Sequence, residues 1–329
     1  MVKSFLETWL EQRVKRQNRP RTYRSYADIV WLHLIPHIGK YQLVKLTPEQ
    51  VQAMLNTLAE QGLKPRTVSN VRAVLRKALN QAMRWGYVVR NVATLVDAPR
   101  TTIFSIQPLD QEQAQRLLNA VAGHRLEALY RVALSLGLRR GEVCCLRWED
   151  IDFEQQTLRI TGSLQRVNGK LERAVPKTAA SVRTIALPPV LLRVLRLQAE
   201  RQAHERAELG DEWLDCGLVF VSERGTPLEP RKVVRHFKVV LKKAGLPETF
   251  RFHDLRHLCA TLLIAQGVHP RVIMEILGHS QISTTMNTYA HVLPATQREA
   301  TAKIDALFPE RAVPIATNET ETHEASGVR

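Results

Sequence analysis

Apolar residues in the first 95 positions recur every three or four residues, which is the period of an amphipathic α-helix. Four such runs follow one another: one from Phe5 to Val14, one after Pro20, one after Pro48 and one after Pro65. Residues 47–50, Thr-Pro-Glu-Gln, have the sequence of a capping box. The pattern therefore predicts a compact bundle of four helices over residues 1–95.

Residues 96–107 break this pattern and precede Pro108, so we interpret them as a linker. Helical spacing then returns and lasts to about residue 136. After Asp152 the period shortens toward two, and Asn168-Gly169 is a strong hairpin signal. The pattern predicts a small antiparallel sheet with strands at 157–160, 163–167, 171–175 and 182–187.

The rest of the chain is mainly helical in pattern. Helices are expected at 188–208, 230–244, 254–266, 270–277 and 294–308, and a short buried strand at 218–222. Asp254 is the expected N-cap of one helix, and Gly278 the expected end of another. The polar residues 309–329 are expected to be disordered. The predicted fold is mainly α with a small antiparallel β-sheet, with a second domain at 108–308.

Composition sets limits on the class of protein. A chain of 329 residues with 44% hydrophobic residues is long enough for about two domains, each with its own core. No apolar run reaches the roughly 18 residues of a membrane span, and the N-terminus lacks a signal-peptide pattern. We therefore expect a cytoplasmic protein with no membrane partner. The cysteines show no C-x-x-C pairing, which favours reduced thiols over a disulfide framework or a metal site.

Positive charge is concentrated near the N-terminus. Residues 1–99 hold 16 Lys and Arg against 6 Asp and Glu, so this stretch carries +10 of the formal +15. A basic balance alone is compatible with a membrane surface or with mere solubility. Its concentration in one predicted helical bundle favours a module that grips the phosphates of DNA.

Residues 251–291 contain the strongest candidate chemistry, with His253, Arg256, His279 and Tyr289 in this order. A single histidine or tyrosine is more often a partly buried packing residue than a catalytic one. The string as a whole, however, resembles the second active-site box of the tyrosine recombinase (phage integrase) family. That box contains H-x-x-R, then a histidine, then the nucleophilic tyrosine nine or ten residues later. Here the last interval, from His279 to Tyr289, is ten residues.

Two further segments resemble the same family. Residues 137–152, GLRRGEVCCLRWEDID, resemble its first box, in which a turn between two helices presents an arginine. Alignment selects Arg139, with Arg140 as the competing choice, and Glu142 is expected to orient an arginine rather than act as a base. The segment PKTAASVRTIAL resembles P-K-T-x-x-S-x-R, which places Lys177 on a β-hairpin that reaches the scissile base step.

The resemblance implies a SAM-like core-binding domain at 1–95 and an α+β catalytic domain at 108–308. It implies a site-specific recombinase or integrase that cleaves and rejoins DNA through a 3′-phosphotyrosyl intermediate and a Holliday junction, without ATP, metal or other cofactor. The expected catalytic residues are Arg139, Lys177, His253, Arg256, His279 and the nucleophile Tyr289. The expected partner is double-stranded DNA, with a monomer in free solution and a homotetramer on synapsed sites.

Two alternatives remain at this point. A type IB topoisomerase shares the chemistry but rejoins the same strand, and the box sequences favour the recombinase. A catalytically silent DNA-binding regulator on the same fold would lack a box residue, and none is missing. Because the chain begins at once with the bundle, we expect no separate upstream arm-binding domain. The resemblance also implies that the helix at 294–308 docks on a neighbouring protomer, and the alternative is that it packs on its own domain.

Overall fold

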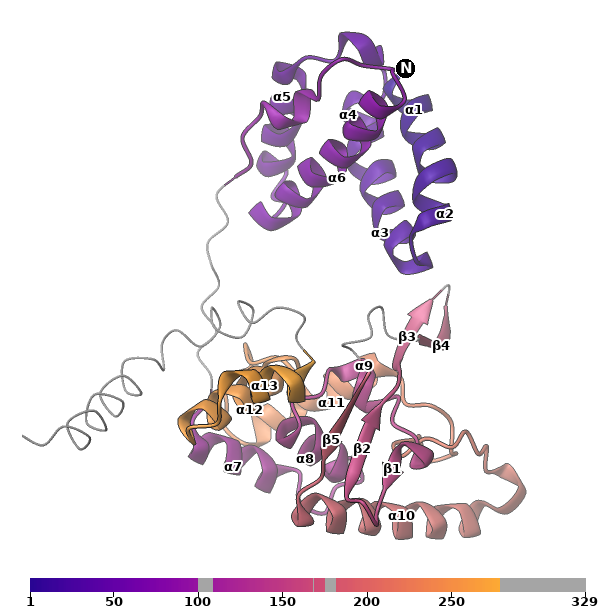
Figure 1. The fold of residues 1–329 in the computed structure, drawn as a ribbon, viewed down its shortest axis with the longest axis vertical. Coiled ribbons are helices and arrows are strands. Elements are labelled where there is room, and N and C mark those ends of the chain that lie inside the picture. The colour runs from indigo at the N-terminus through magenta and orange to yellow at the C-terminus, as the bar shows by residue number, and fades with distance from the viewer. Residues whose placement is uncertain (100–108, 168, 175–181, 279–329) are drawn as a thin grey trace, which may run out of the picture. The chain divides into compact units, whose positions relative to one another are not determined.

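The computed structural model describes residues 1–99, 109–167, 169–174 and 182–278. These residues separate into two compact units (Figure 1). One is a helical unit formed by the N-terminal residues, and the other contains most of the residues after 108 and combines helices with strands. Each unit is described separately. None of the described helices is both long and apolar enough to cross a membrane.

The helical unit consists of two continuous helical segments, called rods below, and two further helices. The first rod runs through α1 (Val2–Trp9), the π-helical turns η1 (Leu10–Val14) and α2 (Lys15–Gln17). The second runs through α3 (Pro20–Ile29), the π-helical turns η2 (Val30–Leu34) and α4 (Ile35–Ile38). The short 3-10 turn η3 (Leu43–Lys45), α5 (Pro48–Glu60), α6 (Pro65–Arg84) and the 3-10 turn η4 (Val92–Thr94) follow. The predicted bundle of four helices is confirmed.

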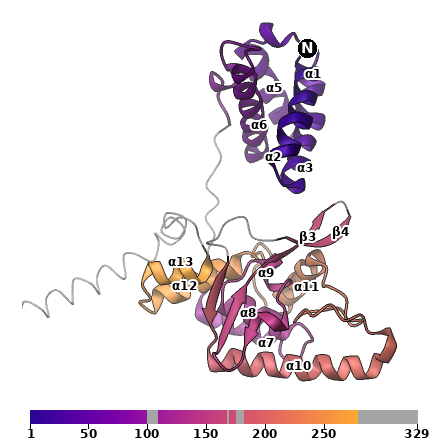
Figure 2. The same ribbon diagram turned by 45° about the vertical axis from the view of Figure 1, so that its right-hand side comes forward.

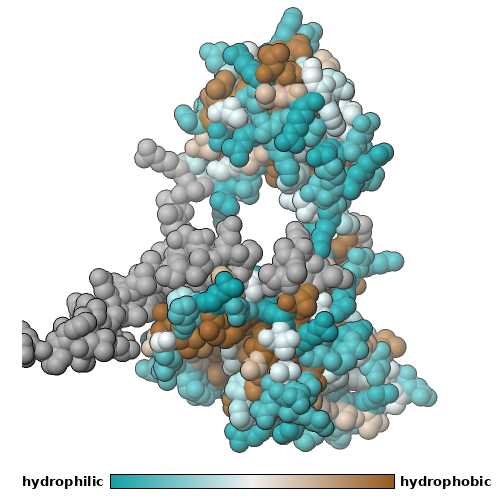
Figure 3. Space-filling model, in the orientation of Figure 1, coloured by the Kyte–Doolittle hydropathy of each residue, from teal (hydrophilic) through white to brown (hydrophobic). Residues whose placement is uncertain are grey.

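Local capping and a single apolar core hold this unit together. The Thr47 hydroxyl accepts a hydrogen bond from the Gln50 N–H, and the Gln50 side chain accepts one from the Thr47 N–H, so the predicted capping box is present. Trp9 is fully buried and stacks on Tyr26 with ring centroids 5.9 Å apart. Polar and charged side chains cover most of the visible face of the unit (Figure 3).

The first residues of the predicted linker pack on this bundle. Val96 is buried in the apolar core of the unit, and the Asp97 N–H donates a hydrogen bond to the Gln52 side chain. Residues 100–108 lie outside the described part of the chain. The domain boundaries, the linker at 96–107 and the tail at 309–329 therefore stay predictions.

The mixed unit contains seven described α-helices. They are α7 (Gln111–Ala120), α8 (Glu127–Ser135), α9 (Arg140–Val143), α10 (Pro189–Leu209), α11 (Pro230–Lys243), α12 (Asp254–Ala265) and α13 (Pro270–Leu277). Two 3-10 turns, η5 (Trp148–Asp150) and η7 (Gly210–Glu212), accompany them. Helix α8 lies at the centre, in contact with α7, α9, α10 and α12. Its buried residues join α10, α11 and α12 in one apolar core.

The strands form two small antiparallel arrangements rather than the single sheet that the sequence predicts. Strands β1 (Ile151–Asp152), β2 (Thr157–Ile160) and β5 (Arg183–Ala186) form a three-stranded sheet in the order β1-β2-β5, with Ile160 opposite Arg183. Strands β3 (Ser163–Val167) and β4 (Lys170–Ala174) form a separate two-stranded ribbon. Helix α10 lies across one end of the three-stranded sheet in both views (Figures 1 and 2).

The predicted strand at 218–222 is wrong, although its burial is right. Residues 218–221 are buried, but they form only isolated bridges, Arg147 with Leu218 and Val221 with Pro227. Their backbone hydrogen bonds are instead made singly, with a distant segment and within a turn: the Val219 N–H donates to the Leu146 carbonyl, and the Ser222 N–H donates to the Thr226 carbonyl. A short apolar run indicates burial but does not by itself distinguish a strand from a buried turn.

Candidate active site

A glycine turn between α8 and α9 presents Arg139. Gly137 has φ +58°, and a Cβ atom at this position would lie only 2.3 Å from Cδ2 of Leu277. Glycine is therefore required both for the left-handed backbone and for the close approach of α13. Arg139 is the N-cap residue of α9, and its side chain is 39% exposed. The turn thus holds a guanidinium at the surface, as the first-box resemblance implies.

Glu142 fixes the orientation of Arg139. Its Oε1 accepts a hydrogen bond from Nη1 of Arg139 at 2.7 Å, and its Oε2 accepts one from the Arg139 backbone N–H at 3.1 Å. Burial opposes ionisation of this carboxyl, but the guanidiniums of Arg183 and Arg139 outweigh burial and hold the pKa of Glu142 below its usual value. Glu142 is therefore a buried carboxylate that orients arginines, as predicted from the sequence.

The side chain of Arg140, the competing choice in the first box, behaves differently. It makes no hydrogen bond or ion pair within the described part of the chain. It is half-buried, in the first turn of α9, and its charge acts on the buried thiol of Cys144. This difference supports Arg139 as the oriented arginine of the pair.

Arg256 supports the same turn from α12. It is 2% exposed, and its Nη1 donates a hydrogen bond of 2.9 Å to the carbonyl of Gly137, which is 119 residues away in sequence. A fully buried guanidinium beside the turn of Arg139 places two permanent positive charges in one region. The fold therefore brings the arginines of the two resembling boxes to the same turn.

His253 lies at the start of α12, and here one prediction needs correction. The N-cap of α12 is His253, without a side-chain cap, whereas Asp254 is the first helical residue and is buried. The Asp254 carboxylate is turned back to accept hydrogen bonds from the backbone N–H of Arg251 at 2.7 Å and from its guanidinium. Asp254 therefore holds Arg251 and does not cap α12.

The surroundings of His253 favour its neutral form. The residue as a whole is exposed, yet packing around the ring disfavours the charged form, and the nearby His257, Arg256 and Arg139 add positive potential. Together they lower the pKa of His253 to about 4. The ring of His257 meets it edge to face, with centroids 5.3 Å apart. At neutral pH His253 can therefore donate one hydrogen bond and accept another.

The end of α13 reaches Arg139 through its backbone. Gly278 caps the helix in the left-handed conformation, with φ +66°, as the sequence predicts. Its carbonyl accepts a hydrogen bond of 3.1 Å from Nη2 of Arg139. The fold thus brings the residue before His279 to the first box. Lys177, His279 and Tyr289 themselves lie outside the described residues, so their roles stay predictions.

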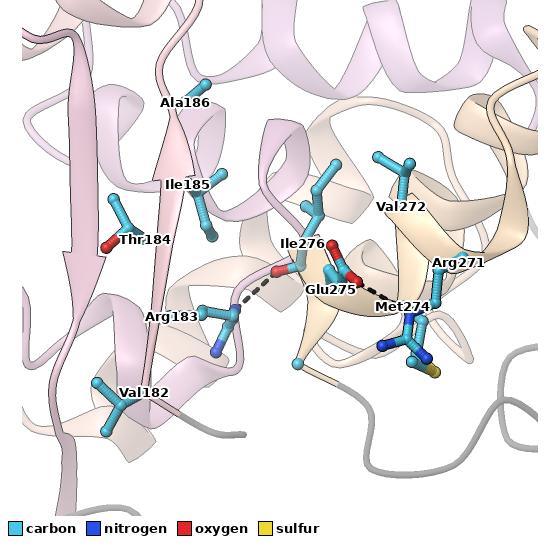
Figure 4. A pocket seen from close by; sticks show the side chains of 11 residues that line it. Val182, Arg183, Thr184, Ile185, Ala186, Arg271, Val272, Met274, Glu275 and Ile276 are labelled. Carbon is cyan, nitrogen blue, oxygen red and sulfur yellow. Dashed lines mark hydrogen bonds and ion pairs between the residues drawn. The ribbon is translucent and has the colours of Figure 1, made fainter. Parts of the chain in front are cut away.

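Arg183 is the functional candidate that sequence reasoning did not single out. Its side chain is 7% exposed, its Nη2 donates to Oε2 of Glu142 at 3.0 Å, and its Nε donates to the Ile276 carbonyl at 2.7 Å. The only signal in the sequence is that Arg183 is the final arginine of the P-K-T-x-x-S-x-R segment. It lines a groove of about 560 Å³ between β5 and α13 (Figure 4).

The described residues contain no group of three or more His, Cys, Asp or Glu side chains arranged to hold a metal ion. Cys144, Cys145, Cys216 and Cys259 are free thiols. Burial raises the pKa of Cys145 and Cys216 above the ordinary thiol value, and that of Cys144 and Cys259 to about 12. Among the described residues of the site, the ionised groups are thus arginines and their carboxylates.

Comparison with known proteins identifies the family. Residues 107–296 match the phage integrase family, and residues 1–59 match its N-terminal SAM-like domain. A tyrosine recombinase XerC-like protein of Caldanaerobacter subterraneus subsp. tengcongensis is 31% identical, over 92% of this chain and 82% of that protein. The ICEBs1 integrase of Bacillus subtilis is 28% identical, over 88% of this chain and 79% of that protein.

Solved structures show the same fold. The Tn1549 transposon integrase in complex with a circular intermediate DNA superposes with a TM-score of 0.77 at 22% identity, over 92% of this chain and 99% of that chain. A lambda integrase tetramer bound to a Holliday junction gives a TM-score of 0.62 at 21% identity, over 85% and 77% of the two chains. The chain belongs to the phage integrase family and is a tyrosine recombinase. The predicted fold class is confirmed, and neither alternative function gains support.

Proposed function

We propose that this recombinase cleaves one strand of double-stranded DNA with Tyr289, forms a 3′-phosphotyrosyl bond and passes the strand to a partner duplex. The observation that supports this most strongly is the meeting of Arg139, Arg256 and His253. Arg256 bonds the turn that carries Arg139, and both arginines lie near enough to His253 to lower its pKa. These residues come from the two boxes that the sequence resembles.

This arrangement suits attack on a phosphodiester. The non-bridging oxygens of DNA are anionic, so a catalyst must stabilise the charge that grows on them as the nucleophile approaches. Guanidinium groups donate paired hydrogen bonds to phosphate and keep their charge at any working pH. Arg139, held by Glu142 and the Gly278 carbonyl, would bind one such oxygen. Arg256 would add positive charge from its buried position behind the turn that carries Arg139.

Proton transfer falls to the remaining residues. Tyrosine is a weak nucleophile at neutral pH until its proton is accepted or its phenolate is stabilised. His253, neutral because its pKa is lowered, can accept that proton or donate to the phosphate, and His279 would share this task. Lys177 would protonate the departing 5′ oxygen. The phosphotyrosyl bond conserves the energy of the bond broken, so rejoining needs neither ATP nor a metal ion.

The helical unit provides a surface for DNA. Helix α6 buries its apolar face and exposes four basic side chains: Arg66, Arg76, Lys77 and Arg84. Such a row along one helix suits the phosphate backbone. We propose that the protein binds each half-site as a monomer from free solution and assembles as a homotetramer on synapsed sites in the cytoplasm. Strand exchange then passes through a Holliday junction.

A plasmid recombination assay tests this function. The DNA that flanks the gene supplies the candidate site, and two copies of it on one plasmid report exchange as deletion or inversion. Purified protein should yield recombinant circles in the presence of EDTA, and the recombinants should carry an exact junction. Supercoil relaxation without any recombinant product would instead indicate topoisomerase activity. A requirement for Mg²⁺ would contradict the metal-free mechanism.

A further inference from the structure

Arg183 connects three elements of the mixed unit through one buried side chain. It begins β5, where it lies opposite Ile160 of β2. Its Nε donates to the Ile276 carbonyl in the last turn of α13 (Figure 4). Its Nη2 donates to Glu142 in α9. A buried guanidinium is retained at a cost in solvation that only a close carboxylate and carbonyl can offset.

The two arginines divide the Glu142 carboxylate between them. Arg183 binds Oε2 and Arg139 binds Oε1 with its guanidinium, so the side chain of Arg139 contacts one carboxylate oxygen only. An arginine carries five N–H donors, of which Arg139 uses one for Glu142 and one for Gly278 among the described residues. Two guanidiniums around one carboxylate also leave a net positive charge. Donors and charge thus remain for a phosphate.

Without Arg183, both oxygens of Glu142 become available to the guanidinium of Arg139. A guanidinium prefers to bind a carboxylate with two parallel hydrogen bonds, and such a pair is neutral as a whole. Arg139 would then rotate toward Glu142 and present fewer donors and less charge to DNA. The end of α13 would lose its bond to β5 at the same time.

The neighbouring glycine fits this role. A Cβ atom on Gly278 would lie 2.9 Å from Nη1 of Arg183, so the guanidinium passes directly against the backbone of the residue that bonds Arg139. Arg183 therefore packs against the Gly278 backbone and bonds Glu142, the two groups that hold the Arg139 side chain. In sequence it ends the P-K-T-x-x-S-x-R segment that carries Lys177. In the fold it contacts Gly278, the residue before His279.

We infer that Arg183 is a positioning residue for Arg139. Arg183 occupies one oxygen of Glu142 and bonds the end of α13, so that Arg139 presents its remaining donors to the scissile phosphate. Arg183 does not itself touch DNA in this role. The inference rests on the proposed function of Arg139 and adds a residue to which neither the family resemblance nor the comparisons assign a task.

Single-turnover cleavage of a nicked suicide DNA tests this inference, with Arg183→Met and Arg183→Lys as variants. Arg125→Met is the matched control, because Arg125 also pairs with a carboxylate, Glu205 at 2.6 Å, and donates to backbone carbonyls. Arg183→Met should slow cleavage by about 100-fold, the scale of a misplaced catalytic group, with DNA affinity within about threefold of wild type. Arg183→Lys, which keeps the charge but not the fork, should be intermediate.

The pH profile separates positioning from mere stability. Loss of Arg183 removes a major favourable charge from Glu142 and raises the pKa of Glu142, so the acid limb of the cleavage rate should move to higher pH. Arg125→Met should lower the melting temperature without moving this limb. If Arg183→Met fails to fold, the folded Arg183→Lys variant carries the same comparison.

The outcomes are distinct from those that test the proposed function. Absence of any covalent adduct with the wild-type protein and its site would refute the proposed cleavage by Tyr289. A wild-type adduct, together with equal rates and equal pH profiles for the Arg183 and Arg125 variants, would refute only the positioning role. A slow variant with a shifted acid limb would support it.

Discussion

Nη1 of Arg139 lies 2.7 Å from Oε1 of Glu142, three residues further along the chain. The carboxylate is almost fully buried, whereas the guanidinium that it holds is 39% exposed. The exposed group is therefore oriented by a partner that is fixed by packing and not by mobile solvent. Donors that are oriented before the substrate arrives need no reorganisation during the reaction, which is the largest contribution in many enzymes.

Removal of either arginine of the site should mainly affect the chemical step. Arg139→Ala and Arg256→Ala are each expected to slow single-turnover cleavage by about two orders of magnitude or more, the scale of losing a preorganised donor. Because Arg256 is buried, Arg256→Lys serves as a second variant that keeps the charge and much of the volume. Arg140→Ala is the control. A loss of cleavage rate below tenfold on replacing Arg139 or Arg256 would show that this residue does not stabilise the reacting phosphate.

The acid stability of the mixed unit should depend on Glu142. The pKa of Glu142 is lower in the folded protein than its ordinary value of 4.5, so its stabilising effect is fully present above that pH and is lost as pH falls through the folded value. Melting temperatures of wild type and Glu142→Gln should therefore differ most above pH 4.5 and converge below it. A difference that stays constant from neutral to acid pH would contradict this account.

His253 should remain neutral well below the pH at which free histidine titrates. Its pKa is about 4 in the folded protein, against an ordinary 6.5, so an NMR titration of the ring should show no charge change above about pH 5. The unfolded chain binds this proton first, so the stability of the folded protein should decline as pH falls from 6.5 toward 4. His253→Gln should reduce that decline in stability. An NMR titration midpoint near pH 6.5 would refute the lowered pKa of His253.

The turn before Arg139 should tolerate no side chain at Gly137. Gly137→Ala adds left-handed strain and a clash with Leu277, so both stability and cleavage should fall. Gly245→Ala is the matched control, because Gly245 has a similar φ of +64° and open space around the added atom. The control should lose only about 1 kcal/mol of unfolding free energy and keep normal cleavage. Equal effects at both glycines would show that packing against α13 does not matter.

Much of the fold follows from local sequence signals. The cap at Thr47 and Gln50, the start of α13 at Pro270 and its end at Gly278 depend on residues within one or two turns, and each is confirmed. The predicted strand at 218–222 is wrong because an apolar run along the chain indicates burial, whereas the presence of strand partners depends on distant residues. The sequence therefore predicts a helix or strand where residues close along the chain determine its conformation.

The site divides in the same way. Arg139 and Arg256 could be selected by resemblance, and Glu142 could be predicted as a partner because it lies in the same short segment as Arg139. The bond between Glu142 and Arg183 joins residues 41 positions apart, and no periodicity or spacing in one sequence predicts it. It exists because the fold brings the start of β5 beside α9, which only the folded chain shows.

The central claim is that Tyr289 is the nucleophile, and covalent capture tests it most directly. A nicked suicide DNA, which loses the fragment needed for rejoining, should trap the wild-type protein as a protease-sensitive adduct whose linked peptide contains Tyr289. Tyr289→Phe should abolish the adduct and leave DNA affinity nearly unchanged, because only the attacking oxygen is lost. Tyr87→Phe, at an exposed tyrosine of the helical unit, should form the adduct normally. An adduct with Tyr289→Phe, or a linked peptide with another tyrosine, would contradict the account.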